Sequence, residues 1–311
     1  MQTRNLLLTL LLIAASTGCS IKRFAINKIG DALATGGSTY QTDDDIELVG
    51  GALPFGLKLI EGLLAESPKH KGLLLAACQG FTGYSHVYVR ARADEAAEED
   101  LDRAAALRQR ARRLYLRGHQ YCADGLEASY PGITERMQGE PPAVAAIGKK
   151  KDVPLLYWTA ASLGLAISVS KDDAAMLARL PEVEALLGQA MKLDESWEKG
   201  ALHEFQVTFL SSKPGGAEPV RVKEAYQRAL ELSQGSSAGL FVAYAEAVPL
   251  ANQDRAAFRE LLEKALAVDP DDHKDVRLTN LVAQKRARWL LARIDDLILE
   301  VEKTKTEGEI Q

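Results

Sequence analysis

The residues of this chain that could support catalysis begin with a serine flanked by glycines. Residues 235–239 read G-S-S-A-G and match the G-x-S-x-G pattern of hydrolase nucleophiles. That nucleophile needs a strand before the serine and a helix after it. The residues before Gly235 have helical periodicity instead. We therefore interpret Gly235 as the glycine that ends one helix, followed by a serine N-cap of the next.

The other chemically capable side chains do not form a recognisable site. The five histidines are scattered at His70, His86, His119, His203 and His273. None belongs to an H-E-x-x-H motif or to a His/Cys cluster with metal-ligand spacing. The acidic turn at residues 269–272 lacks the glycine and the distal glutamate of a calcium loop. We expect no catalytic residue, no metal and no cofactor, and predict that the chain is not an enzyme.

The charge balance argues against nucleic acid as a partner. Formal net charge is −5, whereas a general nucleic-acid binder needs a basic footprint. Six arginines crowd residues 103–117, and five acids precede them at residues 95–102. Acids at the start and bases toward the end of a helix complement its dipole, which predicts a solvated helix. The alternative is that one or two of these arginines bind a carboxylate.

The first eighteen residues have the features of an export signal. Arg4 gives a positive start, and residues 6–15 form an apolar run that is too short to cross a bilayer as a helix. Ser16, Thr17 and Gly18 then precede Cys19, a pattern that resembles the lipobox of bacterial lipoproteins.

The lipobox resemblance implies a signal peptide at residues 1–18, a lipid anchor on Cys19 and a lipidated segment at residues 19–42. Ser20 is not the aspartate that retains lipoproteins at the inner membrane, so a periplasmic protein anchored to the outer membrane is implied. The alternative is an ordinary secretory signal with a chance cysteine. No segment of the mature chain is expected to be apolar enough to span a membrane.

Most of the mature chain has helical periodicity. Phe258, Leu261, Leu262, Ala265 and Leu266 follow the i, i+3, i+4, i+7, i+8 template. Similar amphipathic segments ending in an acid and a turn recur at 59–68, 186–196 and 261–272 and resemble tetratricopeptide repeats. We predict an all-α fold of degenerate tetratricopeptide-like helical hairpins, stacked into one curved, solenoid-like domain at residues 43–302, with a polar tail at 303–311.

Two cysteines, Cys78 and Cys122, remain in the mature domain. If residues 70–91 and 96–126 form an antiparallel hairpin, Cys78 lies opposite Gln109. The offset of thirteen residues corresponds to about 20 Å, too far for a disulfide. We therefore favour two buried thiols over a disulfide, which an oxidising compartment would allow.

Several motifs, taken in order, resemble the T component (TatT family) of tripartite ATP-independent periplasmic (TRAP) transporters. They are D-D-D at 43–45, A-L-P-F at 52–55, R-L-Y-L-R at 113–117, V-P-L-L-Y-W at 153–158, F-L-S-S at 209–212 and R-L-T-N-L-V-A-Q-K-R-A-R-W-L-L at 277–291. This resemblance implies a non-catalytic periplasmic lipoprotein that forms homotrimers. It also implies binding to the solute-binding component of the transporter and passage of small, hydrophobic organic acids through a pore.

Five residues are candidates for the pore or for a ligand or partner site. They are Tyr157, Trp158, Asn280, Gln284 and Arg288. An amide within an apolar helix must pair or face water, and an arginine can bind a carboxylate bidentately. The alternative is that the aromatic residues are core and the two amides bond neighbouring helix ends. The alternative function is a generic outer-membrane adaptor for envelope assembly, with no solute.

Overall fold

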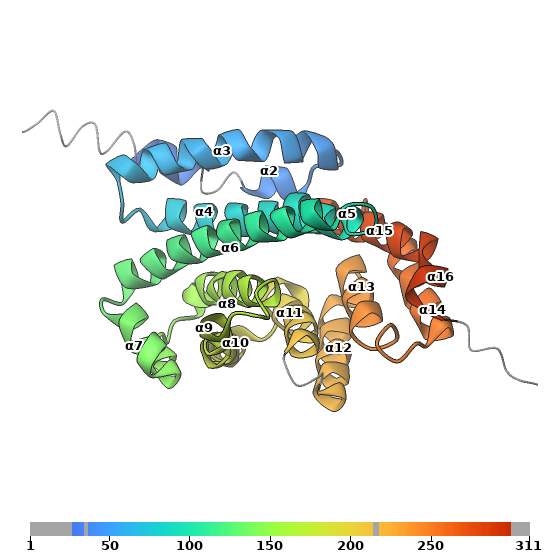
Figure 1. Cartoon of the computed structure of the whole chain (residues 1–311). Coiled ribbons are helices and arrows are strands. Elements are labelled where there is room, and N and C mark those ends of the chain that lie inside the picture. The colour runs from blue at the N-terminus through green and yellow to red at the C-terminus, as the bar shows by residue number, and fades with distance from the viewer. Residues whose placement is uncertain (1–26, 34–36, 214–217, 300–311) are drawn as a thin grey trace, which may run out of the picture. The chain divides into compact units, whose positions relative to one another are not determined.

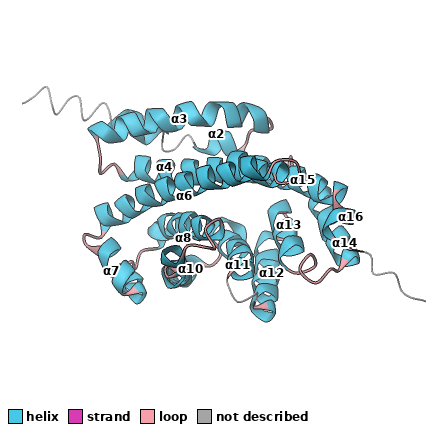
Figure 2. Cartoon of the chain, in the orientation of Figure 1, coloured by secondary structure: helices cyan, strands magenta, loops and turns pink. Residues whose placement is uncertain are grey.

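The computed structural model describes residues 27–33, 37–213 and 218–299. Every regular element within these ranges is helical and none is a strand, which confirms the all-α prediction (Figure 2). The predicted signal peptide at 1–18, the anchor at Cys19 and the tail at 303–311 lie outside the described residues. The chain divides into two compact units, unit 1 up to Glu198 and unit 2 from Lys199. The single domain predicted for residues 43–302 stays a prediction.

Unit 1 contains the helices labelled α2 to α10 in Figure 1. They are α2 (Gly37–Gln41), α3 (Ile46–Glu66), α4 (Lys71–Tyr84), a π-helical turn (Ser85–Arg90), α5 (Ala91–Ala96), α6 (Leu101–Ser129), α7 (Ile133–Gly139), two 3₁₀ segments (Pro141–Ala146 and Lys150–Asp152), α8 (Val153–Ser168), α9 (Ala174–Leu177) and α10 (Leu180–Asp194). Successive helices pack as antiparallel neighbours: α4 lies against α3 and α6, and α8 lies against α6 and α10.

Helix α3 begins directly after an acidic cap. Asp45 is its N-cap and accepts hydrogen bonds from the backbone N–H groups of Glu47 (3.0 Å) and Leu48 (2.9 Å). Pro54 lies inside the helix, which runs on unbroken to Glu66. By length and composition α3 could cross a membrane, so the prediction that no mature segment has this character is wrong. It packs on α4 through Leu57 and Leu64, which share a buried cluster with Leu73, Leu74, Ala77 and Phe81 of α4.

The hairpin of α4 and α6 corrects the cysteine prediction. Cys78 and Cys122 are joined by a disulfide, with 5.4 Å between their Cα atoms. The first arm of the hairpin continues to Ala96 and the second begins at Leu101, so the turn lies later than the sequence suggested. This later turn shifts the register by most of the thirteen-residue offset and brings Cys122 opposite Cys78.

Close packing of the two helices fixes the same register. A Cβ atom added at Gly118 would lie 2.6 Å from the Thr82 hydroxyl oxygen and 3.1 Å from the Cys78 carbonyl oxygen. Nearer the turn of the hairpin, the Ser85 hydroxyl donates a hydrogen bond to the Ala111 carbonyl oxygen at 2.9 Å. Glycine at 118 therefore permits the approach that the disulfide needs.

Unit 2 is a second stack of helical hairpins. Its elements follow a 3₁₀ turn (Trp197–Gly200) that begins in unit 1; they are α11 (Ala201–Ser212), α12 (Pro219–Ser233), α13 (Ala238–Ala247), α14 (Arg255–Ala267), a 3₁₀ segment (Lys274–Val276), α15 (Arg277–Ala292) and α16 (Ile294–Leu297). Helix α13 packs on α11, α14 and α15, so each hairpin buries the apolar face of the next. Phe258, Leu262 and Ala287 are fully buried in this core.

The G-S-S-A-G segment lies between α12 and α13. Gly235 has a φ of +78°, and the Ser237 hydroxyl accepts a hydrogen bond from the Leu240 backbone N–H at 3.2 Å as the N-cap of α13. A helix precedes the serines, as predicted. This confirms the reading as a helix end followed by a helix start.

Candidate functional site

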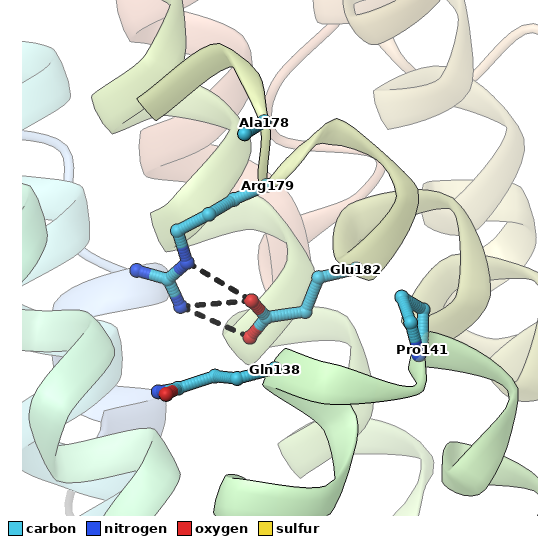
Figure 3. A pocket seen from close by; sticks show the side chains of 5 residues that line it. All are labelled: Gln138, Pro141, Ala178, Arg179 and Glu182. Carbon is cyan, nitrogen blue, oxygen red and sulfur yellow. Dashed lines mark hydrogen bonds and ion pairs between the residues drawn. The ribbon is translucent and has the colours of Figure 1, made fainter. Parts of the chain in front are cut away.

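A hollow of about 300 Å³ opens in unit 1 where α7 ends and α10 begins (Figure 3). It is lined by Gln138, Pro141, Ala178, Arg179 and Glu182. Arg179 is the residue before α10, and Glu182 stands in the first turn of that helix, where its charge suits the positive end of the helix dipole. The guanidinium binds the carboxylate bidentately, Nε to Oε2 at 2.9 Å and Nη2 to Oε1 at 3.0 Å.

A buried histidine stands behind this ion pair. Arg179 Nη2 donates to His119 Nε2 at 2.9 Å, so Nε2 carries no proton and Nδ1–H donates to the Thr159 carbonyl oxygen at 3.3 Å. Burial, reinforced by the charge of Arg179, lowers the pKa of His119 to about 4. The imidazole is therefore neutral at physiological pH and acts as a fixed bridge between α6, α8 and the start of α10.

Burial shifts the pKa of Glu182, in the same cluster, upward, whereas it shifts the pKa of His119 downward. Burial raises the pKa of its carboxyl, and the neighbouring Arg179 only partly offsets that rise. The Ser162 hydroxyl adds a further hydrogen bond to the Thr159 carbonyl oxygen at 3.1 Å. The hollow thus presents an amide, a guanidinium and a paired carboxylate, which are groups that hydrogen-bond a small polar molecule.

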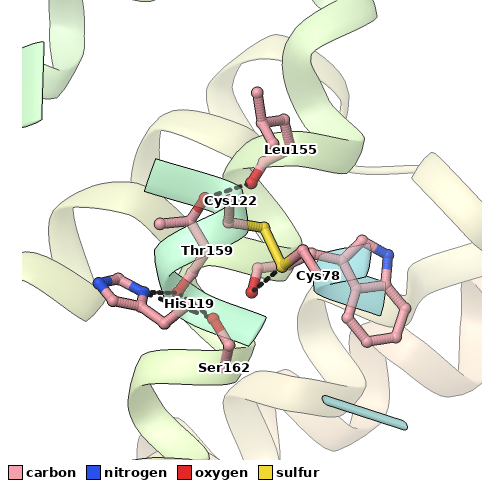
Figure 4. The surroundings of a disulfide bond; sticks show 7 residues. Cys78, His119, Cys122, Leu155, Thr159 and Ser162 are labelled. Carbon is pink, nitrogen blue, oxygen red and sulfur yellow. Dashed lines mark hydrogen bonds between the residues drawn. A yellow bond between two sulfur atoms is a disulfide. The ribbon is translucent and has the colours of Figure 1, made fainter. Parts of the chain in front are cut away.

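The cluster adjoins the disulfide through α6. Cys122 and His119 are one turn apart on that helix, and Thr159 and Ser162 face it from α8 (Figure 4). Both cysteines are fully buried. A buried disulfide persists in oxidising compartments, which accords with a location in the cell envelope.

The aromatic candidates lie on α8 and acquire a third partner. The ring of Tyr157 meets that of Trp158 edge-on, with 5.1 Å between centroids, and lies 4.8 Å from the ring of Trp197. All three side chains are half-buried. Trp197 comes from the turn after α10, so the helical periodicity of α8 could not predict that it joins this cluster. The only sequence feature that indicated it was a large aromatic residue next to a helix end.

The remaining candidates lie on α15 in unit 2. Asn280 accepts from the Ala238 backbone N–H at 2.9 Å and donates to the Ser236 carbonyl oxygen at 3.0 Å, joining α15 to the start of α13. Gln284 donates to carbonyl oxygens at the end of α14, the shortest contact being 2.7 Å to Val268. Both amides are buried, whereas Arg288 is exposed. The amides thus bond neighbouring helix ends, the alternative that the sequence left open.

The arginine-rich segment forms part of α6, a single helix capped by Asp100, which accepts from the Arg103 backbone N–H at 2.9 Å. Arg112 binds Asp173 at 2.5 Å, and Arg117 binds Glu61. The carboxylates that these two arginines bind are therefore the chain's own.

The fold and these contacts define a protein of stacked helical hairpins. The family model of the TRAP transporter T-component (TAtT) matches residues 42–298. The chain belongs to this family, as its resemblance implied, and is an accessory component associated with the TRAP transport system. The chain is also similar to an uncharacterized protein of Treponema pallidum (strain Nichols), with 29% identity over 305 residues, which cover 91% of this chain and 94% of the relative.

Proposed function

We propose that this chain is a non-catalytic, lipid-anchored periplasmic T component that binds the solute-binding protein of its transporter. The family match over residues 42–298, on an all-helical hairpin fold, carries the proposal. Stacked helical hairpins offer extended binding surfaces, and the buried disulfide supports an oxidising compartment. A solute-binding protein bound in this way would bring its solute to the T component.

A crosslinking pull-down from the native envelope tests this partner. We expect a tagged chain to recover the periplasmic solute-binding protein of a TRAP transporter. Recovery of outer-membrane assembly factors alone would contradict the proposal and favour the generic adaptor. The same chain with the tag but without crosslinker is the control for non-specific capture.

The solute role is a second part of the proposal: small organic acids contact Tyr157 and Trp158 in unit 1 and, separately, Arg288 in unit 2. Half-buried aromatic rings suit an apolar solute body, and an exposed guanidinium suits its carboxylate. We expect Trp158→Ala and Arg288→Ala to reduce solute uptake with the helical content unchanged. Arg259→Ala, another exposed arginine of unit 2, is the control. Uptake unaltered by both substitutions would discard the solute role of these residues.

Anchoring and assembly are tested separately. Cys19→Ala should release the chain from the membrane fraction or block its processing, since acyl chains supply the attachment. A Cys19→Ala protein that is processed and still fractionates with membranes would contradict the anchor. The homotrimer, which is implied by the family resemblance, predicts a native mass of three chains or a multiple of three.

A further inference from the structure

One corner of unit 1 joins the first described residues to the loop between α3 and α4, at the left of Figure 1. Residues 27–33 are helical, and the Ser67 hydroxyl of the loop donates a hydrogen bond to Asn27 Oδ1 at 2.9 Å. His70, whose Nδ1 caps α4, directs Nε2 toward the Asn27 carbonyl oxygen at 3.2 Å and a carboxylate oxygen of Asp31 at 3.3 Å. These contacts hold the helical segment 27–33 in one position on unit 1.

The outward side of this segment is apolar and basic. Gly30 faces α4, since a Cβ atom added there would lie 2.9 Å from the Leu73 side chain. Lys28 and Ala32 are each two residues from Gly30, which places them on the opposite side of the helix, and both are exposed. Ile29 is 53% exposed. The segment therefore presents one cation and one large apolar side chain away from the body of unit 1.

Two exposed lysines of the adjoining loop are not explained by the packing of unit 1. Lys69 and Lys71 stand on either side of His70 in the sequence, and neither forms an ion pair within the described residues. Lys71 is the first residue of α4, where the helix dipole favours an acid over a base. These two ammonium groups therefore remain available to a partner outside the chain.

The acids at this end of α3 and α6 and in the segment 27–33 are, in contrast, engaged within the chain. The acids at residues 43–47 lie at the opposite end of α3, about 30 Å away. The engaged acids are Asp31 beside His70, Glu61 with Lys58 and Arg117, Asp124 with Gln120, Glu127 with Thr134, and Glu66. The charge left without a partner at this corner is therefore positive, although the net charge of the whole chain is −5.

The proposed lipid anchor is close to this corner along the chain. Cys19 precedes Asn27 by eight residues, and a fully extended chain of this length spans about 28 Å. Residues 20–26 read S-I-K-R-F-A-I, with two bases, four apolar residues and no acid. Apolar residues mixed with lysine and arginine are typical of segments that lie in a membrane interface. An anchored Cys19 therefore keeps the corner within about 28 Å of the bilayer surface.

We propose that this corner, defined as residues 27–33 with Lys69 and Lys71, lies on the membrane that holds the anchor. The lysine ammonium groups then meet the phosphate groups of anionic lipids, and Ile29 enters the headgroup layer. The acyl chains supply the attachment, and the corner supplies a direction, because a tether alone lets the protein turn freely. This placement rests on the lipid anchor proposed above. Unit 1 is thereby held with one defined side toward the bilayer.

A lipid surface suits this corner better than a second protein does. Its exposed apolar side chains are Ile29 and Pro68, whereas a stable protein interface buries about 800 Å² on each partner. Lysines are depleted in the buried core of such interfaces, and Lys28, Lys69 and Lys71 are all exposed here. Lysines that border an apolar residue are instead the usual composition of a peripheral membrane contact.

Fluorescence quenching by lipid tests the placement in the full-length, lipidated chain. The protein is reconstituted into phosphatidylethanolamine–phosphatidylglycerol vesicles with an environment-sensitive dye on Ile29→Cys. The native cysteines do not take the dye, because Cys78 and Cys122 form a buried disulfide and Cys19 carries the lipid. Lipid spin-labelled at the headgroup should quench this dye about five times more strongly than a dye on Leu101→Cys. Leu101, 73% exposed, begins α6 at the far end of the hairpin, about 40 Å along the helices from the corner.

Charge reversal tests the lysines without removing the anchor. Lys69→Glu with Lys71→Glu should reduce the quenching at position 29 to about half of its wild-type value or less, while the protein still sediments with the vesicles. Lys69→Arg with Lys71→Arg should keep the wild-type value. Lys149→Glu with Lys151→Glu makes the same charge change at two other exposed lysines of unit 1 and is the matched control, which should have no effect.

Sedimentation and quenching separate the corner from its anchor. A labelled chain that does not sediment with vesicles contradicts the anchor and this placement together. A chain that sediments but shows equal quenching at positions 29 and 101 overturns the placement and leaves the anchor standing. A dye at position 29 that is shielded from water yet not quenched by lipid also overturns it, since a protein then covers the corner. Equal loss of quenching in both charge-reversed pairs overturns the role of the two lysines.

Discussion

Unit 1 and unit 2 use different chemistry to hold one helix of a stack against the next. Unit 1 joins α4 to α6 by the Cys78–Cys122 disulfide and joins α6, α8 and α10 through His119, Arg179 and Glu182. Unit 2 joins α13 and α14 to α15 through the neutral amides of Asn280 and Gln284. Redox state should therefore act on unit 1 and leave unit 2 largely unchanged, whereas each unit holds a buried carboxyl whose pKa is raised by burial, Glu182 in unit 1 and Glu204 in unit 2.

Removing the disulfide should give the largest difference between the units. For a bridge across 44 residues of sequence, the chain-entropy model gives about 4 kcal/mol of stabilisation. Cys78→Ala with Cys122→Ala should lower protection in α4 and α6 by up to this amount, measured by native-state hydrogen exchange. Peptides from α15 are the internal control. An equal loss in both units would show that they unfold together, as one domain.

Acid should have the next largest effect, a loss of stability in unit 1 through His119. The pKa of His119 falls from 6.5 unfolded to about 4 folded, so the unfolded state binds the proton more readily between these values. Stability is therefore present above pH 6.5 and lost as pH falls toward 4. The difference amounts to at most about 3 kcal/mol. Glu182 acts in the opposite direction, because its folded pKa is raised and its cost disappears as the carboxyl protonates.

A His119→Gln variant isolates the histidine from the glutamate. The wild type should lose more stability than His119→Gln between pH 7 and pH 4, in unit 1 peptides only. Circular dichroism at both pH values should show whether the variant keeps its helices. Parallel stability–pH curves for the two proteins would contradict the assignment.

Local signals predicted the fold, but long-range register decided the site. The cap at Ser237 and the helix end at Gly235 follow from neighbouring residues, and the sequence indicated both. The disulfide depended on where one turn falls, and a shift of a few residues moved Cys122 by several turns relative to Cys78. The hollow is lined by Gln138 and Arg179, which are 41 residues apart, and no helical period encodes that they share one hollow.

Removing one amide should weaken unit 2 without making it sensitive to reductant. Asn280→Ala leaves the Ala238 N–H and the Ser236 carbonyl oxygen buried without their partner, at a cost of about 2 kcal/mol. Asn252→Ala, at an exposed position of the same unit, should change stability by less than about 0.5 kcal/mol. Hydrogen exchange in α13 and α15 measures the loss. A cost that grows when Cys78–Cys122 is reduced would contradict the separation of the units.

Two matched N-caps provide the smallest and most discriminating comparison. Asp45 caps α3 in unit 1, and Asp254 caps α14 in unit 2 by accepting from the Ala257 N–H at 3.0 Å. Each carboxylate accepts hydrogen bonds from backbone N–H groups at the start of its own helix. Each substitution by alanine should therefore lower the free energy of unfolding by about 1 kcal/mol. Thermal unfolding of the two single variants measures this. Equal costs would mean that local chemistry is the same in both units, so the difference between them resides in the disulfide and the buried ion pair. A much larger cost for Asp45→Ala would instead show that the cap also supports contacts beyond its own helix.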